Sequence, residues 1–265
     1  MDRVIVDEPA RVRTERRGDV LLLGLDRPAK HNALDEATVD AVHEVLREAV
    51  RSPCVLVVHS TTPGVFAAGA DIAELRERDA DDALRAINAD LFARLAAHRW
   101  PTIAVVDGPA LGGGCELALA CDLRWASTRA VFGQPELALG ILAGAGANGR
   151  LPQLVGLPTA RRMLYLGERL DAAAALAAGL ADAVHEPDEV MAAALAAAGR
   201  IAERSWRALE LTKLSLRSAV PDTTAFDITA QALLFDSEDK RERMGRFLDD
   251  QAARRAARLL DRPAP

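Results

Sequence analysis

The sequence predicts an α/β protein built on a largely parallel sheet, and three observations lead to this prediction. Short apolar runs bounded by turn residues, at 54–58 and 102–106, are typical of strands buried on both faces of a parallel sheet. Segments whose apolar residues recur at helical spacing separate these runs. The chain has 265 residues, of which 50% are hydrophobic, and this is enough for one sizeable core.

The N-terminal elements follow from local signals. Two short apolar runs, 12–14 and 20–25, flank Arg17-Gly18-Asp19, and this pattern predicts a β-hairpin. Asp35 is a suitable N-cap for the next helix, and Pro53 ends it. The buried face of this helix should carry Val39, Val42, Leu46 and Ala49. The run 54–58 is then the first fully buried strand.

The same alternation continues along the chain. Leu84, Ile87, Leu91 and Leu95 predict a second helix, which Trp100-Pro101 stops. A strand at 102–106, a glycine-rich loop, a helix near 115–120 and strands near 123–126 and 130–132 should follow. Beyond residue 159 the pattern is almost wholly helical, apart from a short strand at 183–185. We therefore expect a core at 1–204 and a charged, helical C-terminal region at 205–265.

Charge and composition exclude several classes of protein. The net charge is −6, which argues against a nucleic-acid partner because phosphate binding needs clustered lysine and arginine. Cys54, Cys115 and Cys121 lack the paired spacing of a zinc or redox motif. Residues 1–17 do not resemble a signal peptide, and the Ala-rich stretch 172–181 is far too short to span a bilayer. We expect a cytoplasmic protein without membrane contact.

Three consecutive glycines precede the helix near 115–120, at a place suited to an anion. The N–H groups of Gly112, Gly113 and Gly114 can point at negative charge, which the helix dipole also favours. A phosphate loop would need Gly-Lys-Ser/Thr, and a dinucleotide fingerprint would need a glycine at Leu117. A developing oxyanion remains, with the Gly113 N–H as donor. Close packing of a strand on a helix would use the same glycines.

A second possible donor follows the strand at 54–58. Residues 61–72 are small residues and glycine leading into an acidic helix start. Asp71 is interpreted as the N-cap of that helix. The N–H of Ala70, one residue earlier, is then free to face a cleft.

Glu116 and Glu136 are the candidate acids. Each lies near the start of a helical segment, where the dipole alone would favour an acidic residue. Two carboxylates beside two potential oxyanion loops suit a different task, the addition of water across a polarised double bond. That reaction removes one proton and delivers another.

Three motifs in order resemble those of the crotonase family, and specifically its enoyl-CoA hydratases. They are Phe66-Ala67-Ala68-Gly69-Ala70-Asp71, Ala110-Leu111-Gly112-Gly113-Gly114-Cys115-Glu116-Leu117-Ala118 and Phe132-Gly133-Gln134-Pro135-Glu136. Arg27-Pro28, Asn32-Ala33-Leu34, Gly144-Ala145-Gly146 and Ser237-Glu238-Asp239 fall in the same family order. The resemblance therefore covers nearly the whole chain.

The resemblance implies a crotonase-like spiral of ββα units with a C-terminal helical oligomerisation region. It implies a homo-oligomer, either a trimer or a dimer of trimers, acting on an acyl-CoA thioester. The backbone N–H groups of Ala70 and Gly113 would form the oxyanion hole, and Glu116 and Glu136 would be catalytic. Because isomerases of the family often keep only the counterpart of Glu136, both acids favour syn hydration of a 2-trans-enoyl-CoA to a 3-hydroxyacyl-CoA.

Substrate contacts follow from the same resemblance. The Gly144 N–H would help to position the water. Lys30 and His31 lie in the loop where the family approaches the CoA nucleotide, and a phosphate contact and a solvated charge are equally compatible with them. The remaining substrate-binding positions are Ala68, Gly69, Asp71, Ile72 and Pro135. No metal or redox cofactor is expected, since CoA belongs to the substrate and no histidine has partners at metal-ligand spacing.

Two departures from the family pattern keep other functions open. The loop 142–151 lacks the usual proline and one glycine, and Asp249-Asp250-Gln251 replaces a segment whose lysine commonly meets CoA. A Δ3,Δ2-enoyl-CoA isomerase and a biosynthetic acyl-CoA hydratase for an unusual substrate are the enzymatic alternatives. A catalytically silent acyl-CoA-binding or RNA-binding relative is the non-enzymatic one, although the acidic composition argues against RNA.

Overall fold

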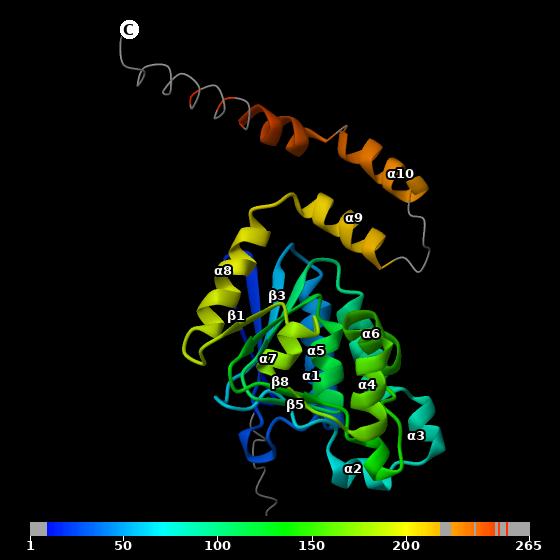
Figure 1. Ribbon diagram of the computed structural model, residues 1–265. Coiled ribbons are helices and arrows are strands. Elements are labelled where there is room, and N and C mark those ends of the chain that lie inside the picture. The colour runs from blue at the N-terminus through cyan, green and yellow to red at the C-terminus, as the bar shows by residue number, and fades with distance from the viewer. Residues whose placement is uncertain (1–9, 218–223, 236, 247–248, 250–252, 254–265) are drawn as a thin grey trace, which may run out of the picture. The chain divides into compact units, whose positions relative to one another are not determined.

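The computed structural model describes residues 10–217, 224–235, 237–246, 249 and 253. The chain divides into two compact units, Met1–Glu203 and Arg204–Pro265, whereas the sequence predicts a boundary after residue 204. In the C-terminal segment singled out above, Phe247, Leu248, Asp250 and Gln251 lie outside the described residues. Figure 1 labels the elements.

A six-stranded sheet organises the first unit, in the order β1-β2-β3-β4-β6-β9. The predicted hairpin is confirmed, because β1 (Val12–Arg17) and β2 (Val20–Leu25) pair antiparallel around Gly18. All other pairings in this sheet are parallel, as the apolar runs indicate. The parallel strands are β3 (Val55–Ser60), β4 (Thr102–Val106), β6 (Leu123–Ser127) and β9 (Ala183–His185).

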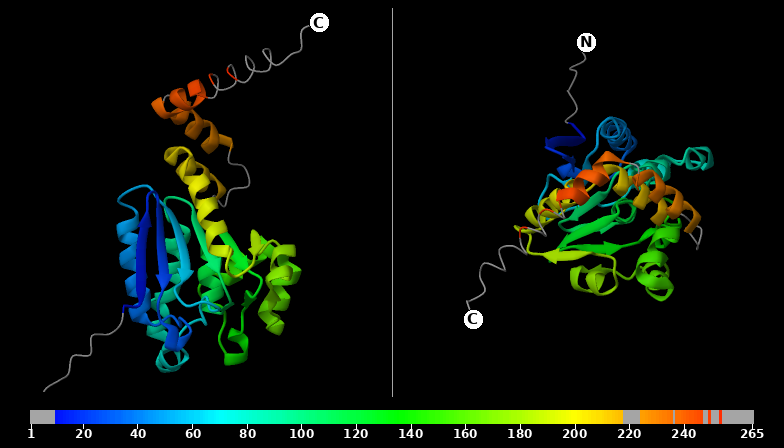
Figure 2. Two further views of the ribbon diagram at one scale, coloured as in Figure 1. Left: turned by 90° about the vertical axis from the view of Figure 1, so that its left-hand side faces the viewer. Right: turned by 90° about the horizontal axis from the view of Figure 1, so that it is seen from above.

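Both faces of this sheet are covered. Leu21, Leu23 and Leu25 point into the main core, whereas the alternate residue Leu22 is buried outside that cluster. The helix α8 (Val190–Ala202) packs across β2, β3, β4 and β6 and covers this second face (Figure 2). The strands β2, β3 and β4 are mainly apolar because both of their faces are buried, whereas the edge strand β1 is polar and largely exposed.

Helices on the main-core side fill the space beneath the sheet. In α1 (Glu36–Ala49) the predicted cap is confirmed, since the Asp35 side chain accepts from Thr38 N at 2.9 Å and the predicted apolar face is buried. It packs against α4 (Ile87–Ala96), which in turn contacts α5 (Gly113–Ala120). The helices α6 (Ala147–Leu166) and α7 (Ala172–Ala177) complete this unit.

The single helix that the sequence predicts from Leu84, Ile87, Leu91 and Leu95 is two helices in the structure. Leu84 ends the short helix α3 (Ala80–Leu84) and is 82% exposed, so it is not on the buried face of α4. Asp79 and Asp82 start α3 with a reciprocal capping box, and Ala86 takes a left-handed conformation (φ +53°) that separates the two helices. The preceding helix α2 (Ile72–Glu77) is capped by Asp71, as predicted.

A small second sheet was not expected. It contains β5 (Pro109–Leu111), β7 (Val131–Gly133) and β8 (Leu170–Asp171), in that order. Only β7 matches a predicted strand. β5 begins with proline, which usually argues against a strand, and β8 has only two residues and therefore no periodicity to detect.

The second unit is helical in its described part. It contains α9 (Trp206–Leu216) and α10 (Thr224–Phe235). The Ser205 hydroxyl caps α9 by accepting from Ala208 N at 3.5 Å, and Arg243 pairs with Asp239 at 2.7 Å one turn away. The role of this region in subunit contacts stays a prediction.

Two segments of the first unit approach each other closely where β5 leads into α5. Ala67 forms an isolated parallel bridge with Ala110, and Leu111 N donates to Ala67 O at 3.1 Å. A Cβ on Gly114 would lie 2.1 Å from the same Ala67 oxygen. Because that neighbour is backbone, no side-chain rotation can relieve the clash. Gly114 is therefore needed for the approach itself.

We predict that Gly114→Ala lowers the free energy of unfolding by at least about 3 kcal/mol, through overpacking against backbone. Gly199→Ala is the matched control, since Gly199 lies in α8 and a Cβ there would have no heavy atom within 4 Å. The control should gain about 0.5–1 kcal/mol from helix propensity. Urea unfolding of both variants measures the difference, and equal stabilities would contradict the packing argument.

Candidate active site

The glycine-rich turn places one free N–H at the start of α5. Gly112 N donates to Gly133 O at 2.9 Å. Gly112 is the N-cap residue of α5, and no side chain caps this end of the helix. Gly113, the first residue of α5, has no carbonyl four residues earlier in the helix to which it could donate. Every residue of α5 is buried. The Gly113 N–H therefore lies inside the protein at the positive end of a helix.

The loop before α2 contributes the second N–H. Leu34 N donates to Gly69 O at 2.7 Å and Asp71 N donates to Leu34 O at 3.3 Å, so the residues on both sides of Ala70 are fixed by backbone bonds. Within the described part of the chain, neither the Ala70 N–H nor the Gly113 N–H has a backbone or side-chain acceptor.

The two free donors lie at one place. The position that a Cβ would take on Gly113 is 3.4 Å from the Ala70 nitrogen. Both residues line the same cavity. Two N–H groups without a protein acceptor are therefore close together at the edge of one cavity.

Partly buried ion pairs hold the Ala70 loop. The Arg27 guanidinium bonds Asp71 Oδ2 at 3.0 Å and Asp35 Oδ2 at 3.0 Å, and it also donates to Ala33 O at 2.9 Å. Burial opposes ionisation of Asp71, but the hydrogen bonds from Arg27 and Ala73 N hold its pKa below the usual range. Asp71 therefore joins the loop to the start of α1 rather than facing the cavity.

Glu116 is the first candidate acid, and α5 places it in the buried interior. It is only 3% exposed, and its Oε1 accepts from Ala145 N at 2.8 Å and Ala147 N at 3.0 Å. Burial raises the pKa of Glu116, while the N–H groups of Ala147 and Ala145 oppose that rise by stabilising the carboxylate. The sequence predicts that the Gly144 N–H helps to position the water. Gly144 lines the cavity, but the N–H groups of Ala145 and Ala147 hold the acid.

Glu136 is the second candidate acid, at the start of the 3₁₀ helix η2 (Glu136–Leu139). It is 8% exposed, and burial raises its pKa to about 7, an effect that the nearby charge of Glu116 reinforces. The Gln134 side-chain amide, oriented to satisfy its neighbours, donates to both carboxylate oxygens at 3.0 Å. A Cβ on Gly112 would lie 2.9 Å from Glu136 Oε1, so the glycine turn also makes room for this acid.

One cavity of about 620 Å³ joins these groups. Its lining includes both free N–H groups, both acids and five of the predicted substrate-binding positions: Ala68, Gly69, Ile72, Pro135 and Gly144. Lys30, His31 and Asp71 are not among its lining residues. Lys30 is exposed at the end of the 3₁₀ helix η1 (Pro28–Lys30), and His31 follows it with φ +50°.

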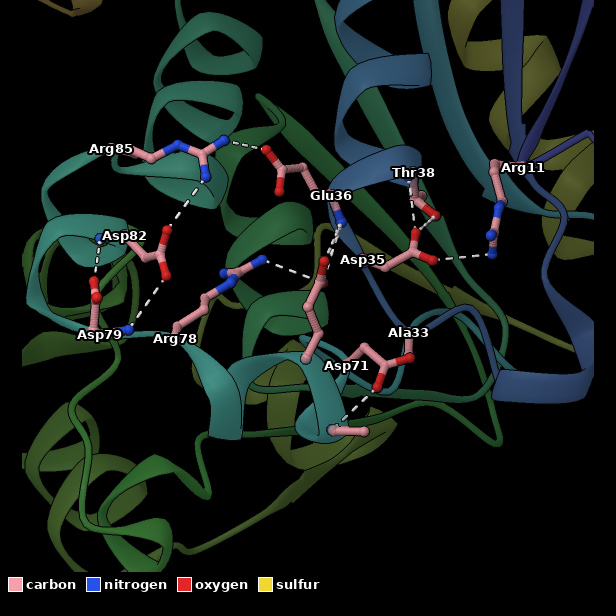
Figure 3. A network of polar contacts seen from close by, with 12 residues as sticks. Arg11, Ala33, Asp35, Glu36, Thr38, Asp71, Arg78, Asp79, Asp82 and Arg85 are labelled. Atoms are coloured by element: carbon pink, nitrogen blue, oxygen red, sulfur yellow. Dashed lines mark hydrogen bonds and ion pairs between the residues drawn. The ribbon is translucent and has the colours of Figure 1, made fainter.

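The outer wall of the cavity was missed by the sequence analysis. Arg78, Asp79 and Asp82 line it from α2 and α3, two helices without a buried residue. Figure 3 shows the polar contacts of this wall, in which Arg85 bonds both Glu36 and Asp82. Arg78 pairs with Glu74 at 3.3 Å, and Glu74 accepts from Glu36 N. The spacing of apolar residues does not reveal the side chains of this wall, because ion pairs hold its two helices in place and contacts with the core do not.

Metal-ligating groups and membrane-spanning helices are both absent from the described residues. The described residues contain no group of three or more His, Cys, Asp or Glu side chains arranged to hold a metal ion. In the same part of the chain, no helix combines the length and apolar character needed to cross a bilayer.

Comparison with known proteins shows the family of this chain. The model of the enoyl-CoA hydratase/isomerase family matches residues 15–254. The short-chain-enoyl-CoA hydratase of Clostridium acetobutylicum is 36% identical over 89% of this chain and 93% of its own. The 2,3-dehydroadipyl-CoA hydratase of Escherichia coli is 39% identical over 88% of this chain and 93% of its own.

A solved structure shows the same architecture. The crystal structure of an enoyl-CoA hydratase from Bacillus anthracis superposes with a TM-score of 0.87 at 26% identity, covering 91% of this chain and 97% of that one. This confirms the predicted crotonase-like fold. From the family match over most of its length and from these relatives, the chain belongs to the enoyl-CoA hydratase/isomerase family.

Proposed function

We propose that this chain is an enoyl-CoA hydratase, a hydro-lyase that adds water syn across the double bond of a 2-trans-enoyl-CoA. The observation that carries the proposal is the cavity that two buried carboxylates and two neighbouring, unpaired N–H groups line together. Hydration of an unsaturated thioester needs both the carboxylates, which transfer protons, and the N–H groups, which bind the thioester oxygen. Addition at C3 places negative charge on the thioester oxygen, and C2 must then receive a proton.

The Ala70 and Gly113 N–H groups take the thioester oxygen. They polarise the carbonyl in the ground state and bind more strongly as the enolate forms, because their positions are fixed before reaction. Removing one such donor typically costs about 3–4 kcal/mol of transition-state stabilisation.

The two acids divide the proton transfers according to their surroundings. Two N–H donors favour the charged form of Glu116, so it accepts a proton from the water whose oxygen bonds to C3. With a pKa of about 7, Glu136 is partly protonated at neutral pH and donates to C2. The proton gained by Glu116 returns to Glu136 through solvent between turnovers. Because both acids line one cavity, hydroxyl and proton reach the same face of the double bond.

The rest of the substrate extends beyond this centre. Ala68, Gly69, Ile72 and Pro135 contact the thioester region of the ligand, and the Gly144 N–H helps to place the water. The exposed Lys30 and His31 are assigned to the CoA phosphates, which need cationic partners on an acidic protein. No further cofactor is required, since CoA is part of the substrate. All three cysteines are free and buried, which suits a reducing cytoplasm.

We predict that Glu116→Gln and Glu136→Gln each lower kcat by roughly 10²–10⁴-fold, because each removes one proton transfer. Glu168→Gln is the control, since Glu168 lies outside the cavity and pairs with Arg162. Turnover is followed by loss of the conjugated enone absorbance, with crotonyl-CoA, longer enoyl-CoAs and 2,3-dehydroadipyl-CoA as substrates.

Mass spectrometry of the products separates hydration from isomerisation, because hydration adds the mass of water and isomerisation does not. Conversion of a 3-enoyl-CoA to its 2-enoyl isomer without hydration would support the isomerase instead. Absence of turnover on every substrate by a folded protein would overturn the proposed function.

A second prediction concerns stability and pH. The folded-state pKa of Glu136 is raised from 4.5 to about 7, so the folded state binds this proton more tightly than the unfolded state does. Stability from the bound proton is therefore present at low pH and is lost as the pH rises towards 7. Between pH 5 and 8 the native protein should lose roughly 2–3 kcal/mol relative to Glu136→Gln. Urea unfolding at both pH values, at one protein concentration, measures this; parallel pH dependences would contradict the raised pKa.

We also propose a homo-oligomer, a trimer or a dimer of trimers. One exposed apolar surface of the first unit fits a subunit contact: Leu137, Leu142 and Tyr165 line a small cavity together, and Tyr165 and the adjacent Leu166 are 69% and 77% exposed. Surfaces of this kind commonly mark protein contacts.

Light scattering after size-exclusion chromatography should therefore give a mass that is a multiple of three chains. The double substitution Tyr165→Asp and Leu166→Asp should shift the protein to smaller species, while Leu84→Asp, an equally exposed leucine on α3, should not. A monomeric native protein at micromolar concentration would contradict the proposal.

A further inference from the structure

Asn88 is a polar side chain of the cavity that neither the sequence motifs nor the mechanism above uses. It lies in the first turn of α4, two residues after the left-handed residue Ala86, and it lines the cavity. The position of a Cβ on Gly113 is 3.6 Å from Asn88 Nδ2 and 3.4 Å from the Ala70 nitrogen. The Asn88 amide is therefore beside the two backbone donors.

The hydrogen bonds of this amide are unsatisfied. Asn88 Oδ1 is buried without a partner in the described part of the structure. Among the same residues, Nδ2 has no acceptor either, and Asn88 lines the cavity. A buried polar atom without a partner costs free energy that an alanine or leucine would not cost. The bond that a ligand in the cavity can add to this amide is the one that Nδ2 donates, since Oδ1 is turned away from the cavity into the protein.

The surrounding helix fixes where the amide points. Leu91 and Phe92, on the same helix, are fully buried, and α4 packs against both α1 and α5. Asp90 N donates to Ala86 O at 2.7 Å, which closes the first turn around Asn88. The amide is thus carried on a rigid element that also contacts the helix bearing Gly113, as a preorganised donor requires.

We propose that the Asn88 side-chain N–H is a third hydrogen-bond donor at the oxyanion site, supplementing the N–H groups of Ala70 and Gly113. The inference rests on the proposed function, because it needs a thioester oxygen in that position. Bonding through Nδ2 leaves Oδ1 turned into the protein, in the orientation that the structure shows. The opposite orientation would aim an oxygen at the developing negative charge and repel it.

Kinetics of Asn88 variants with the best enoyl-CoA substrate test the proposal. Asn88→Ala should lower kcat roughly 10- to 100-fold with little change in KM, because the lost bond is strongest in the transition state. Asn88→Asp keeps the size of the side chain but replaces the donor with a carboxylate oxygen, and it should lower kcat further. Asp90→Ala is the control on the same helix, since Asp90 is exposed, pairs with Arg94 at 2.9 Å and does not line the cavity.

A second measurement separates donation from packing. Acetoacetyl-CoA, a β-ketothioester, is titrated in complex with each variant, and its enolate is followed by near-ultraviolet absorbance. Loss of a donor should raise the pH at which the bound ligand forms its enolate in Asn88→Ala and Asn88→Asp, but not in Asp90→Ala. Circular dichroism checks that each variant is folded.

The outcomes distinguish the two proposals. An active native protein whose Asn88 variants keep kcat within twofold, or whose Asn88→Asp variant is as active as the native chain, would overturn the third donor alone. A native protein that hydrates no enoyl-CoA would overturn the proposed function, and the third donor with it.

Discussion

The arrangement of the site depends on one close approach between two backbone segments, residues 66–70 and 109–114. Three hydrogen bonds join them: Phe66 N and Ala67 N both donate to Pro109 O, and Leu111 N donates to Ala67 O. Space for this contact exists because Gly114 has no side chain. Both free N–H groups lie a few residues beyond this contact, Ala70 after Ala67 and Gly113 after Leu111, and a separate pairing with Leu34 holds Ala70. The positive electrostatic character of the site is therefore produced by main-chain N–H groups. Cationic side chains contribute little, because few of them line the cavity.

Burial then gives the two acids different properties within one cavity. Glu116 accepts from two backbone N–H groups of the segment that starts α6, so its charge is supported by main chain that cannot rotate away. Glu136 depends on the side chain of Gln134, which is itself almost completely buried. Opposite them, α2 and α3 close the cavity through exposed ion pairs, each of which contributes little and is weakened by salt. The chemical centre is thus rigid, while the wall facing the substrate is only weakly attached.

Sequence reasoning reached the elements whose signals are local. The cap at Asp35, the hairpin around Gly18 and the cap at Asp71 were all predictable because one or two neighbouring residues determine them. The family motifs placed Glu116, Glu136, Ala70 and Gly113, and the structure brings all four to one cavity. The remaining features are non-local. Nothing near Asn88 in sequence indicates that α4 will carry it to Gly113, and the spacing of Leu84 gave no sign of the break at Ala86.

The separation of the two backbone donors along the chain also has a consequence for folding. Ala70 comes before α2, and Gly113 comes after β5, with three helices and two strands between them. Neither donor site can form within a short fragment, because Ala70 is held by its pairing with Leu34 and the segment that leads to Gly113 is held by the pairing of Ala110 with Ala67. Closing a loop of that length is entropically costly and slow compared with forming a single helix. The site therefore comes into existence only when the core around it is assembled, and ligand binding reports on the completion of the fold.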